Sequence, residues 1–283
     1  MITVLDAIIL GIIQGLTEFL PVSSTAHLTL AGKLLGLIDP AHPEDWTAFI
    51  AIMQLGTVTA VIIYFLKDIF TMLGALARDW NQRGQGPGVR WSNDSRLAGL
   101  IIVGTLPVAI IGPAFKHAIE GMFTKETGTI ATSLIVLALI LLLAERMGTK
   151  KRLVEQTTWV DAVIIGFAQA CALIPGSSRS GTTITAGLFL GFTREAAARF
   201  SFLLSIPAVI ASGLFELYEA RHHLGAIGIL PITISTVVAG IVGYATIAFL
   251  LGYLKTHSTW LFIIYRICLG AILWYCLLQN IIS

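Results

Sequence analysis

The chain has 283 residues, of which 56% are hydrophobic and 12% are charged, and its formal net charge is +2. Soluble domains carry about 25% charged residues, so this composition excludes an ordinary water-soluble protein. The small net charge also gives no reason to expect a nucleic-acid partner. We therefore expect an all-α integral membrane protein.

The first predicted element is a broken helical segment over residues 3–37. About 13 apolar residues lead to a break at Leu20–Thr25, and a second helical stretch of about 12 residues follows. Each half is shorter than the roughly 20 residues needed to cross a hydrocarbon core, and Pro21 interrupts the helix between them. Such a segment is either a re-entrant hairpin or a discontinuous span.

Six apolar runs are long enough to cross a membrane. Lipid offers no water to exposed backbone groups, so these runs should be helices. In chain order they are Phe49–Leu66, Ala98–Phe115, Ile130–Ala144, Phe200–Phe215, Ile227–Leu251 and Trp260–Ile282. The glycine-rich stretch 67–95 between the first two runs is predicted to be a cytoplasmic loop with a short interfacial helix.

A second broken segment, residues 158–192, repeats the first. A shift of 155 positions aligns Asp6–Gly36 with Asp161–Gly191, and ten of the 31 aligned positions are identical. Apolar bias explains some of these matches, but it does not explain the paired Asp, Gln and Ser residues. We interpret the chain as two structural repeats, residues 1–155 and 156–283.

Topology favours hairpins over discontinuous spans. If both broken segments are re-entrant hairpins, each repeat has three crossings, and an odd number makes the second repeat inverted relative to the first. One side of the membrane then receives the links 67–95, 146–157, 192–196 and 254–258, which carry most of the Lys and Arg residues outside the spans. The positive-inside tendency places that side in the cytoplasm and both termini outside. One hairpin then enters from each face, so their tips can meet.

Two charged residues in apolar context are the strongest functional candidates. An ionisable group at membrane depth costs at least about 2.5–3.5 kcal/mol, so Glu18 and Arg179 should face each other or a wet cavity. Gln14 lies four residues before Glu18, on the same helix face. These two side chains can hold a divalent cation, or Glu18 can act as a base. Alternatively, Gln14 only satisfies a nearby backbone group.

After each break, a helix is predicted to begin at a cluster of hydroxyl residues. Free N–H groups at such a helix start favour phosphate oxygens, although ordinary N-capping by Ser24 or Ser180 would leave the same pattern. The Arg179 guanidinium matches two phosphate oxygens. Ser24 and His27 offer a nucleophile and an acid/base group. The candidate phosphate-binding residues are Ser23, Thr25, Ser178, Ser180 and Thr183.

These motifs resemble those of the undecaprenyl pyrophosphate phosphatases, the bacitracin-resistance family. The matching strings are QGLTEFLPVSSTAH over residues 14–27 and PGSSRSGTT over 175–183, with shorter matches at 104–107, 200–204 and 264–266. The resemblance therefore runs nearly end to end. By position, the family's essential residues correspond to Glu18, Ser24, His27 and Arg179. Gln14 stands at the family's Glu-or-Gln position.

The resemblance implies a hydrolase that removes the terminal phosphate from a C55 polyprenyl pyrophosphate. That reaction recycles the lipid carrier for peptidoglycan synthesis, and so supports cell-wall biogenesis, cell shape and bacitracin resistance. It also implies a divalent cation, Mg²⁺ or Ca²⁺, held by Glu18 and Gln14, and a multi-pass protein of the bacterial inner membrane with its site open to the periplasm. The oligomeric state stays open, a homodimer included.

Several alternatives remain at this stage. Inverted repeats with broken helices are also the plan of transporters, so a flippase or transporter of a polyprenyl phosphate or another anion is the rival function. For the enzyme, the nucleophile is Ser24, His27 or an activated water, with Glu18 as base or metal ligand and His27 as proton carrier. Arg266, inside the last run, binds either substrate phosphate or a helix carbonyl.

Overall fold

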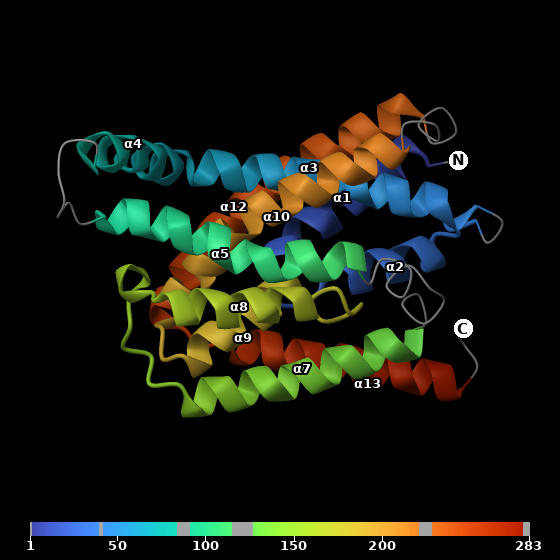
Figure 1. Cartoon of the computed structure of the whole chain (residues 1–283). Helices are drawn as coiled ribbons and strands as arrows, with labels where there is room; N and C mark the ends of the chain where they lie inside the picture. Colours follow the sequence, from blue (N-terminus) through green and yellow to red (C-terminus); the bar gives the residue numbers. More distant parts are fainter. Residues whose placement is uncertain (1, 40–41, 84–90, 115–126, 221–227, 280–283) are drawn as a thin grey trace.

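The computed structural model describes residues 2–39, 42–83, 91–114, 127–220 and 228–279. Within these ranges the regular structure is helical, apart from one isolated bridge between Arg152 and Phe192. The helices are α1 Val4–Phe19, α2 Ser24–Leu34, α3 Pro43–Tyr64, α4 Leu66–Arg83, α5 Asn93–Ala114, α7 Thr127–Met147, the 3₁₀ turn η2 Val154–Gln156, α8 Trp159–Cys171, α9 Arg179–Phe189, α10 Arg194–Ala220, α12 Ile229–Thr256 and α13 Trp260–Leu278. Figure 1 shows them as an elongated bundle.

Six of the described helices are long and apolar enough to cross a membrane, as the hydropathy pattern predicted. They are α3, α5, α7, α10, α12 and α13. Several extend beyond the predicted apolar run because polar residues continue the helix. The segment α5, for example, begins at Asn93 rather than near residue 98. The protein is therefore a multi-pass α-helical membrane protein.

The two predicted broken segments form helical hairpins. Helix α1 packs against α2, and α8 packs against α9. The four helices have 16, 11, 13 and 11 residues, each shorter than the roughly 20 residues of a spanning helix. The inversion of the second repeat relative to the first, and the repeat boundary near residue 155, stay predictions.

Local geometry repeats at the same shift of 155 residues as the sequence. Thr3 and Asp6 form a capping box at the start of α1. Thr158 and Asp161 form the same capping box at the start of α8. In each hairpin, the second helix ends near a glycine with positive φ. These glycines are Gly36, with φ 64°, and Gly191, with φ 85°. Equivalent residues thus begin and end both hairpins.

Glycines allow the hairpins and spans to approach closely. A Cβ added at Gly166 of α8 would lie 2.3 Å from the carbonyl oxygen of Gly104 in α5, and one added at Gly56 of α3 would lie 2.0 Å from that of Thr236 in α12. Small residues at such crossings are the usual way in which membrane helices pack. Helix α1 also packs on α12. The first hairpin is therefore held by a span from the other half of the chain.

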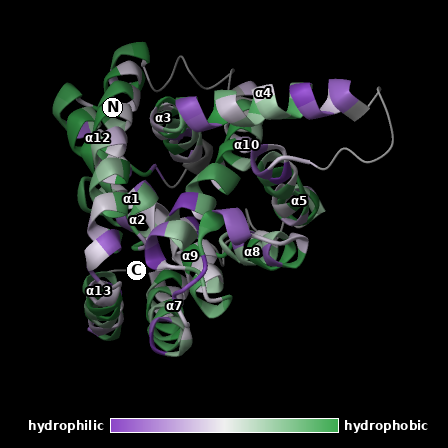
Figure 2. Ribbon diagram, turned by 90° about the vertical axis from the view of Figure 1, so that its left-hand side faces the viewer, coloured by the Kyte–Doolittle hydropathy of each residue, from purple (hydrophilic) through white to green (hydrophobic). Residues whose placement is uncertain are grey.

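Most of the segment predicted as loop 67–95 is helix α4. Figure 2, which looks along the bundle, shows α4 extending sideways across one end of it. Phe70, Leu73 and Trp80 are exposed on one stripe of α4, so the helix is amphipathic, as expected for an interfacial helix. Asp79 accepts hydrogen bonds from Ser92 N (2.7 Å) and Ser95 Oγ (2.6 Å), which ties α4 to the start of α5.

The link before α8 and helix α4 lie at the same end of the bundle, whereas the start of α1 and the end of α13 lie at the other end (Figure 1). At the first end, Arg152 donates to both carboxylate oxygens of Asp161, at 3.0 and 2.5 Å. Burial raises the pKa of Asp161, but the hydrogen bonds from Arg152 and Thr158 outweigh it, so the net pKa lies below its ordinary value. This pair anchors the start of the second hairpin.

Candidate active site

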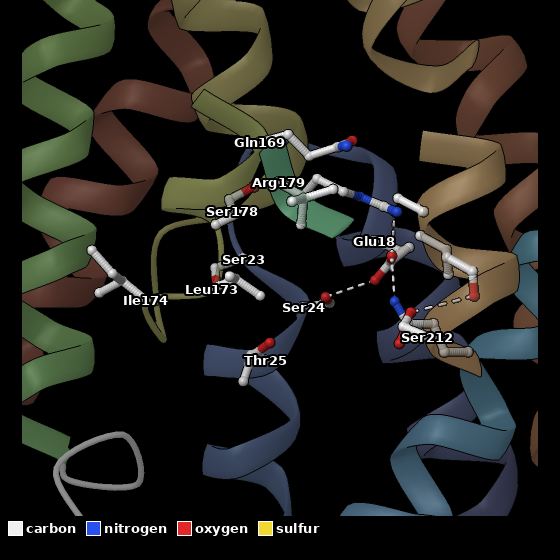
Figure 3. Close-up of a pocket in the computed structure, with 16 residues that line it drawn as sticks. Glu18, Ser23, Ser24, Thr25, Gln169, Leu173, Ile174, Ser178, Arg179 and Ser212 are labelled. Atoms are coloured by element: carbon white, nitrogen blue, oxygen red, sulfur yellow. Dashed lines mark hydrogen bonds and ion pairs between the residues drawn. The ribbon is translucent and has the colours of Figure 1, made fainter. Parts of the chain in front are cut away.

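The loops at the tips of the two hairpins meet inside the bundle. Arg179 Nη2 at the start of α9 lies 2.6 Å from Glu18 Oε1 near the end of α1. Ser180 Oγ donates to the carbonyl of Leu20 at 3.0 Å, a second contact between the tips. Two charged residues 161 positions apart therefore share one site, as Figure 3 shows.

Four side chains at this site donate hydrogen bonds to Glu18. Its Oε2 accepts from Gln14 Nε2 at 3.1 Å and from Ser24 Oγ at 2.7 Å. Its Oε1 accepts from Gln54 Nε2 at 3.1 Å in addition to Arg179. A buried carboxylate requires such donors to offset its lost hydration. The arrangement fixes the carboxylate beside the Ser24 hydroxyl, in the position of a base.

A cavity of about 200 Å³ lies over the Glu18–Arg179 pair (Figure 3). Its polar wall includes Glu18, Ser23, Ser24, Thr25, Gln54, Gln169, Ser178, Arg179 and Ser212. Its apolar wall includes Val108 of α5 and Ala208 and Val209 of α10. Prolines 107 and 207 lie inside these two helices, directly before the lining residues. The cavity thus has a charged floor and an apolar side between two proline-containing spans.

Each tip contains one serine with a strained backbone. Ser23 has φ 77° and Ser178 has φ 69°, and they occupy equivalent positions in the two repeats. Positive φ is uncommon for residues other than glycine and costs on the order of 1–3 kcal/mol. Both side chains cap the following helix, Ser23 by accepting from Ala26 N at 3.4 Å and Ser178 from Gly181 N at 3.1 Å. Strain conserved between two halves at a cavity is typical of a functional loop.

This geometry corrects the capping expected from the sequence. N-capping by Ser24 or Ser180 was one of the two interpretations of the hydroxyl clusters, but α2 begins at Ser24 and α9 begins at Arg179. The caps are the preceding residues, Ser23 and Ser178, because their backbone is not helical and their hydroxyls accept from the N–H groups of Ala26 and Gly181. Ser24 Oγ is therefore available to bind Glu18.

The other predicted phosphate-binding residues divide into two groups. Thr25, Ser23 and Ser178 line the cavity, whereas Ser180 and Thr183 are not among its lining residues. Thr183 Oγ1 lies 2.7 Å from the carbonyl of Arg179 and 2.5 Å from Ser201 Oγ. Ser180 and Thr183 therefore brace the first turn of α9.

His27 is not among the residues that line the cavity. Its Nδ1 lies 2.7 Å from the carbonyl oxygen of Ser23, and its Nε2 lies 2.6 Å from the Tyr265 hydroxyl, whose ring it stacks on. A carbonyl only accepts, so Nδ1 carries the proton, and a neutral Nε2 then accepts from tyrosine. The hydrogen bond from His27 therefore holds the backbone carbonyl of the strained residue Ser23 in place.

Arg266 binds the two tips together. Its side chain is completely buried, and its nitrogens lie 3.1–3.2 Å from the carbonyl oxygens of Pro21, Gly176 and Ser177, with Leu134 O at 3.2 Å. Of the two roles left open by the sequence, the structure therefore shows carbonyl binding. One guanidinium holds both loops at a fixed separation.

Sequence reasoning missed Gln54, which reaches the site from α3. It is the lone amide in the apolar run 50–55, and that isolation is the only signal that could have identified it. Gln169 stood out as a polar residue of the second hairpin but received no role. Both residues line the cavity.

The site has one carboxylate, which limits how a cation could bind. Among the described residues, no three His, Cys, Asp or Glu side chains gather into a metal-binding group. However, Gln14 Oε1 is buried without a hydrogen-bond partner in the described part of the chain, directly beside Glu18. An unpartnered amide oxygen, a carboxylate and the Ser24 hydroxyl are the oxygen donors that Mg²⁺ and Ca²⁺ prefer. The donor set fits a hard divalent cation.

Comparisons with known proteins show similarity to one family and to several named enzymes. A family model described as "Bacitracin resistance protein BacA" matches residues 7–272. A protein named undecaprenyl-diphosphatase from Syntrophobacter fumaroxidans is 51% identical over 273 residues, which cover 96% of each chain. Proteins of the same name from Chloroherpeton thalassium and Chlorobium phaeobacteroides are 51% and 50% identical, with 95% of each chain covered.

Proposed function

This chain belongs to the bacitracin resistance protein BacA family, and we propose that it hydrolyses undecaprenyl diphosphate to undecaprenyl phosphate and inorganic phosphate. The observation that carries the proposal is the contact of Ser24 Oγ and Arg179 with the same carboxylate, Glu18, on the floor of one cavity. A nucleophile, a base and a fixed cation are the groups that phosphoryl transfer needs.

The diphosphate binds with its charge over Arg179. Nη2 of Arg179 pairs with Glu18, but Nη1 is buried without a hydrogen-bond partner in the described chain. This nitrogen and the free N–H groups at the starts of α2 and α9 are donors for phosphate oxygens. They stabilise the charge that spreads over the transferred phosphoryl group.

Ser24 is the nucleophile of the proposed reaction. Its Oγ attacks the terminal phosphorus, the bond from that phosphorus to the bridging oxygen breaks, and undecaprenyl phosphate leaves. Glu18, 2.7 Å from Oγ, takes the serine proton. Water then hydrolyses the phosphoserine, releases phosphate and restores Ser24. His27, held between Ser23 and Tyr265, positions this loop.

A divalent cation would be held by Glu18, Gln14 Oε1 and the Ser24 hydroxyl. When bound, it would supply positive charge to neutralise the diphosphate. The oxygen-only donor set supports Mg²⁺ or Ca²⁺ as that ion.

The lipid tail leaves the cavity through its apolar wall, between α5 and α10, where Val108, Ala208 and Val209 lie. The family resemblance supports a location in the bacterial inner membrane with the cavity open to the periplasmic side, and the Lys and Arg distribution supports the cytoplasmic assignment of the basic links. There the enzyme recycles the lipid carrier for cell-wall synthesis.

Phosphate release in detergent tests this function against the transport alternative, because no gradient exists in a micelle. The purified protein should release phosphate from undecaprenyl diphosphate. Ser24→Ala, Glu18→Ala and Arg179→Ala should each lower kcat at least about 100-fold, the usual effect of removing one transition-state contact. Arg199→Gln, at the end of the bundle with α4, is the matched control and should keep its rate. A wild-type protein without phosphatase activity would refute the proposal.

A further inference from the structure

Gln169 is a buried amide with no structural use in the described residues. Its side chain lies two residues before the end of α8, is 2% exposed, and has neither Nε2 nor Oε1 in a hydrogen bond. Buried amides are almost always paired, because an unsatisfied group loses its hydration without compensation. An amide whose nitrogen and oxygen both lack a hydrogen-bond partner is therefore expected to bind a ligand.

The repeat explains why Gln169 has no partner. It is equivalent to Gln14, which donates to Glu18 four residues later. In the second hairpin the residue four positions after Gln169 is Leu173, which offers no acceptor. The same amide is therefore used internally in one hairpin and left free in the other.

Gln169 is one of the residues that line the cavity. Gln169 lines it together with Arg179, whose Nη1 also lacks a hydrogen-bond partner among the described residues. Two unpaired hydrogen-bond donors line one cavity, so the ligand that fits it best has several hydrogen-bond acceptors. An ionised phosphate group has only acceptors. Figure 3 shows Gln169 and Ser24 on opposite sides of the Arg179–Glu18 pair. Gln169 and Ser24 therefore approach a ligand in this cavity from different sides.

We propose that Gln169 Nε2 binds the second phosphate of the substrate, the one that stays on the lipid, while Ser24 attacks the terminal phosphate. This assignment rests on the proposed function. Arg179 lies between the two positions and contacts both phosphates. Gln169 is thus a binding residue that makes the site selective for a diphosphate over a monophosphate.

The test is Gln169→Leu, with Gln82→Leu on the exposed part of α4 as the matched control. Gln169→Leu should raise KM for undecaprenyl diphosphate about tenfold, the factor expected for one lost hydrogen bond to a charged group, with kcat within about twofold by the same reasoning. Gln169→Glu, which keeps the shape but opposes a carboxylate to phosphate, should raise KM further. The control should match the wild type.

Two probes that need no turnover separate this inference from the proposed function. Inorganic pyrophosphate should raise the melting temperature of the wild type, and Gln169→Leu should need about tenfold more of it for the same shift. The response to inorganic phosphate should not change. If the wild type binds pyrophosphate in this way but hydrolyses nothing, the inference stands and the proposed function fails.

Stability gives a third readout. Because the amide is unpaired, Gln169→Leu should melt at the same temperature as the ligand-free wild type or higher, whereas loss of a structural amide would lower it. Unchanged KM and pyrophosphate response in a folded Gln169→Leu protein would overturn the inference. So would a lower melting temperature with an unchanged KM.

Discussion

Neutralising both partners of the Glu18–Arg179 pair should destabilise the protein by less than the two single losses added together. The two side chains are 5% and 18% exposed and 2.6 Å apart. Removing one partner of a buried pair costs about 3–5 kcal/mol because it leaves an unpaired charge away from water, whereas replacing both can be nearly neutral. The cavity beside the pair admits some water, so we expect about 3 kcal/mol for Glu18→Gln.

The double variant Glu18→Gln/Arg179→Met should then lose less stability than the sum of the single variants. We expect a coupling free energy of about 2–3 kcal/mol. Unfolding in mixed detergent micelles, followed by far-UV circular dichroism, gives the four free energies of the cycle. The same variants lose catalysis, but catalysis is not the quantity measured here.

Arg199 and Asp68 provide the matched control. Their contact is 2.5 Å, almost the same length, but their side chains are 33% and 36% exposed. Exposed pairs couple by about 0.2–1 kcal/mol. Equal coupling in the two cycles, or additive effects at Glu18 and Arg179, would refute the reasoning that burial makes this contact strong.

Three further predictions concern Arg266, the close helix contact at Gly56 and the carboxylate of Asp79. Arg266→Met should lower kcat about 100-fold, since a displacement of about 1 Å at reacting groups has that effect. The kcat of Arg266→Lys should lie between those of Arg266→Met and the wild type. An unchanged kcat in Arg266→Met would contradict the role of Arg266 in holding the two tips together. Gly56→Ala places a Cβ 2.0 Å from a carbonyl oxygen of α12, so it should lower the free energy of unfolding by about 1–3 kcal/mol. Gly74→Ala is the control, because no atom lies within 4 Å of its added Cβ, and it should not destabilise the protein. Equal melting temperatures of the two variants would refute the close contact at Gly56. Hydrogen bonds from Ser95 lower the pKa of Asp79 below its ordinary value of 3.8, so its stabilisation is complete above that value and is lost as pH falls through the folded pKa. Asp79→Asn should therefore melt lower than wild type at neutral pH, and the gap should close in acid.

The sequence predicted the spans because the bilayer imposes one strong rule on them. Long apolar runs have to be helices, and all six were found. Their ends were harder to predict, since helices such as α5 and α10 begin with polar residues that hydropathy assigns to links. Helix α4 is amphipathic, so its length could not be read from mean hydropathy, although its stripe of Phe70, Leu73 and Trp80 follows a helical period.

The site was predictable where a residue was chemically out of place in its surroundings. Glu18 and Arg179 stood out for that reason, and the structure brings them together. The direction of His27 was not predictable, because helical spacing does not say which of several neighbours a side chain will meet. Gln54 comes from another helix, and only the packed fold places it against Glu18.

The most direct test of the account is to trap the phosphorylated enzyme. Purified protein is mixed with undecaprenyl diphosphate labelled in the terminal phosphate, quenched within one turnover and digested for mass spectrometry. We expect the label on Ser24, and none in Ser24→Ala. Label on His27, or steady turnover of the wild type with no covalent label at any time, would contradict attack by Ser24 from the floor of this cavity.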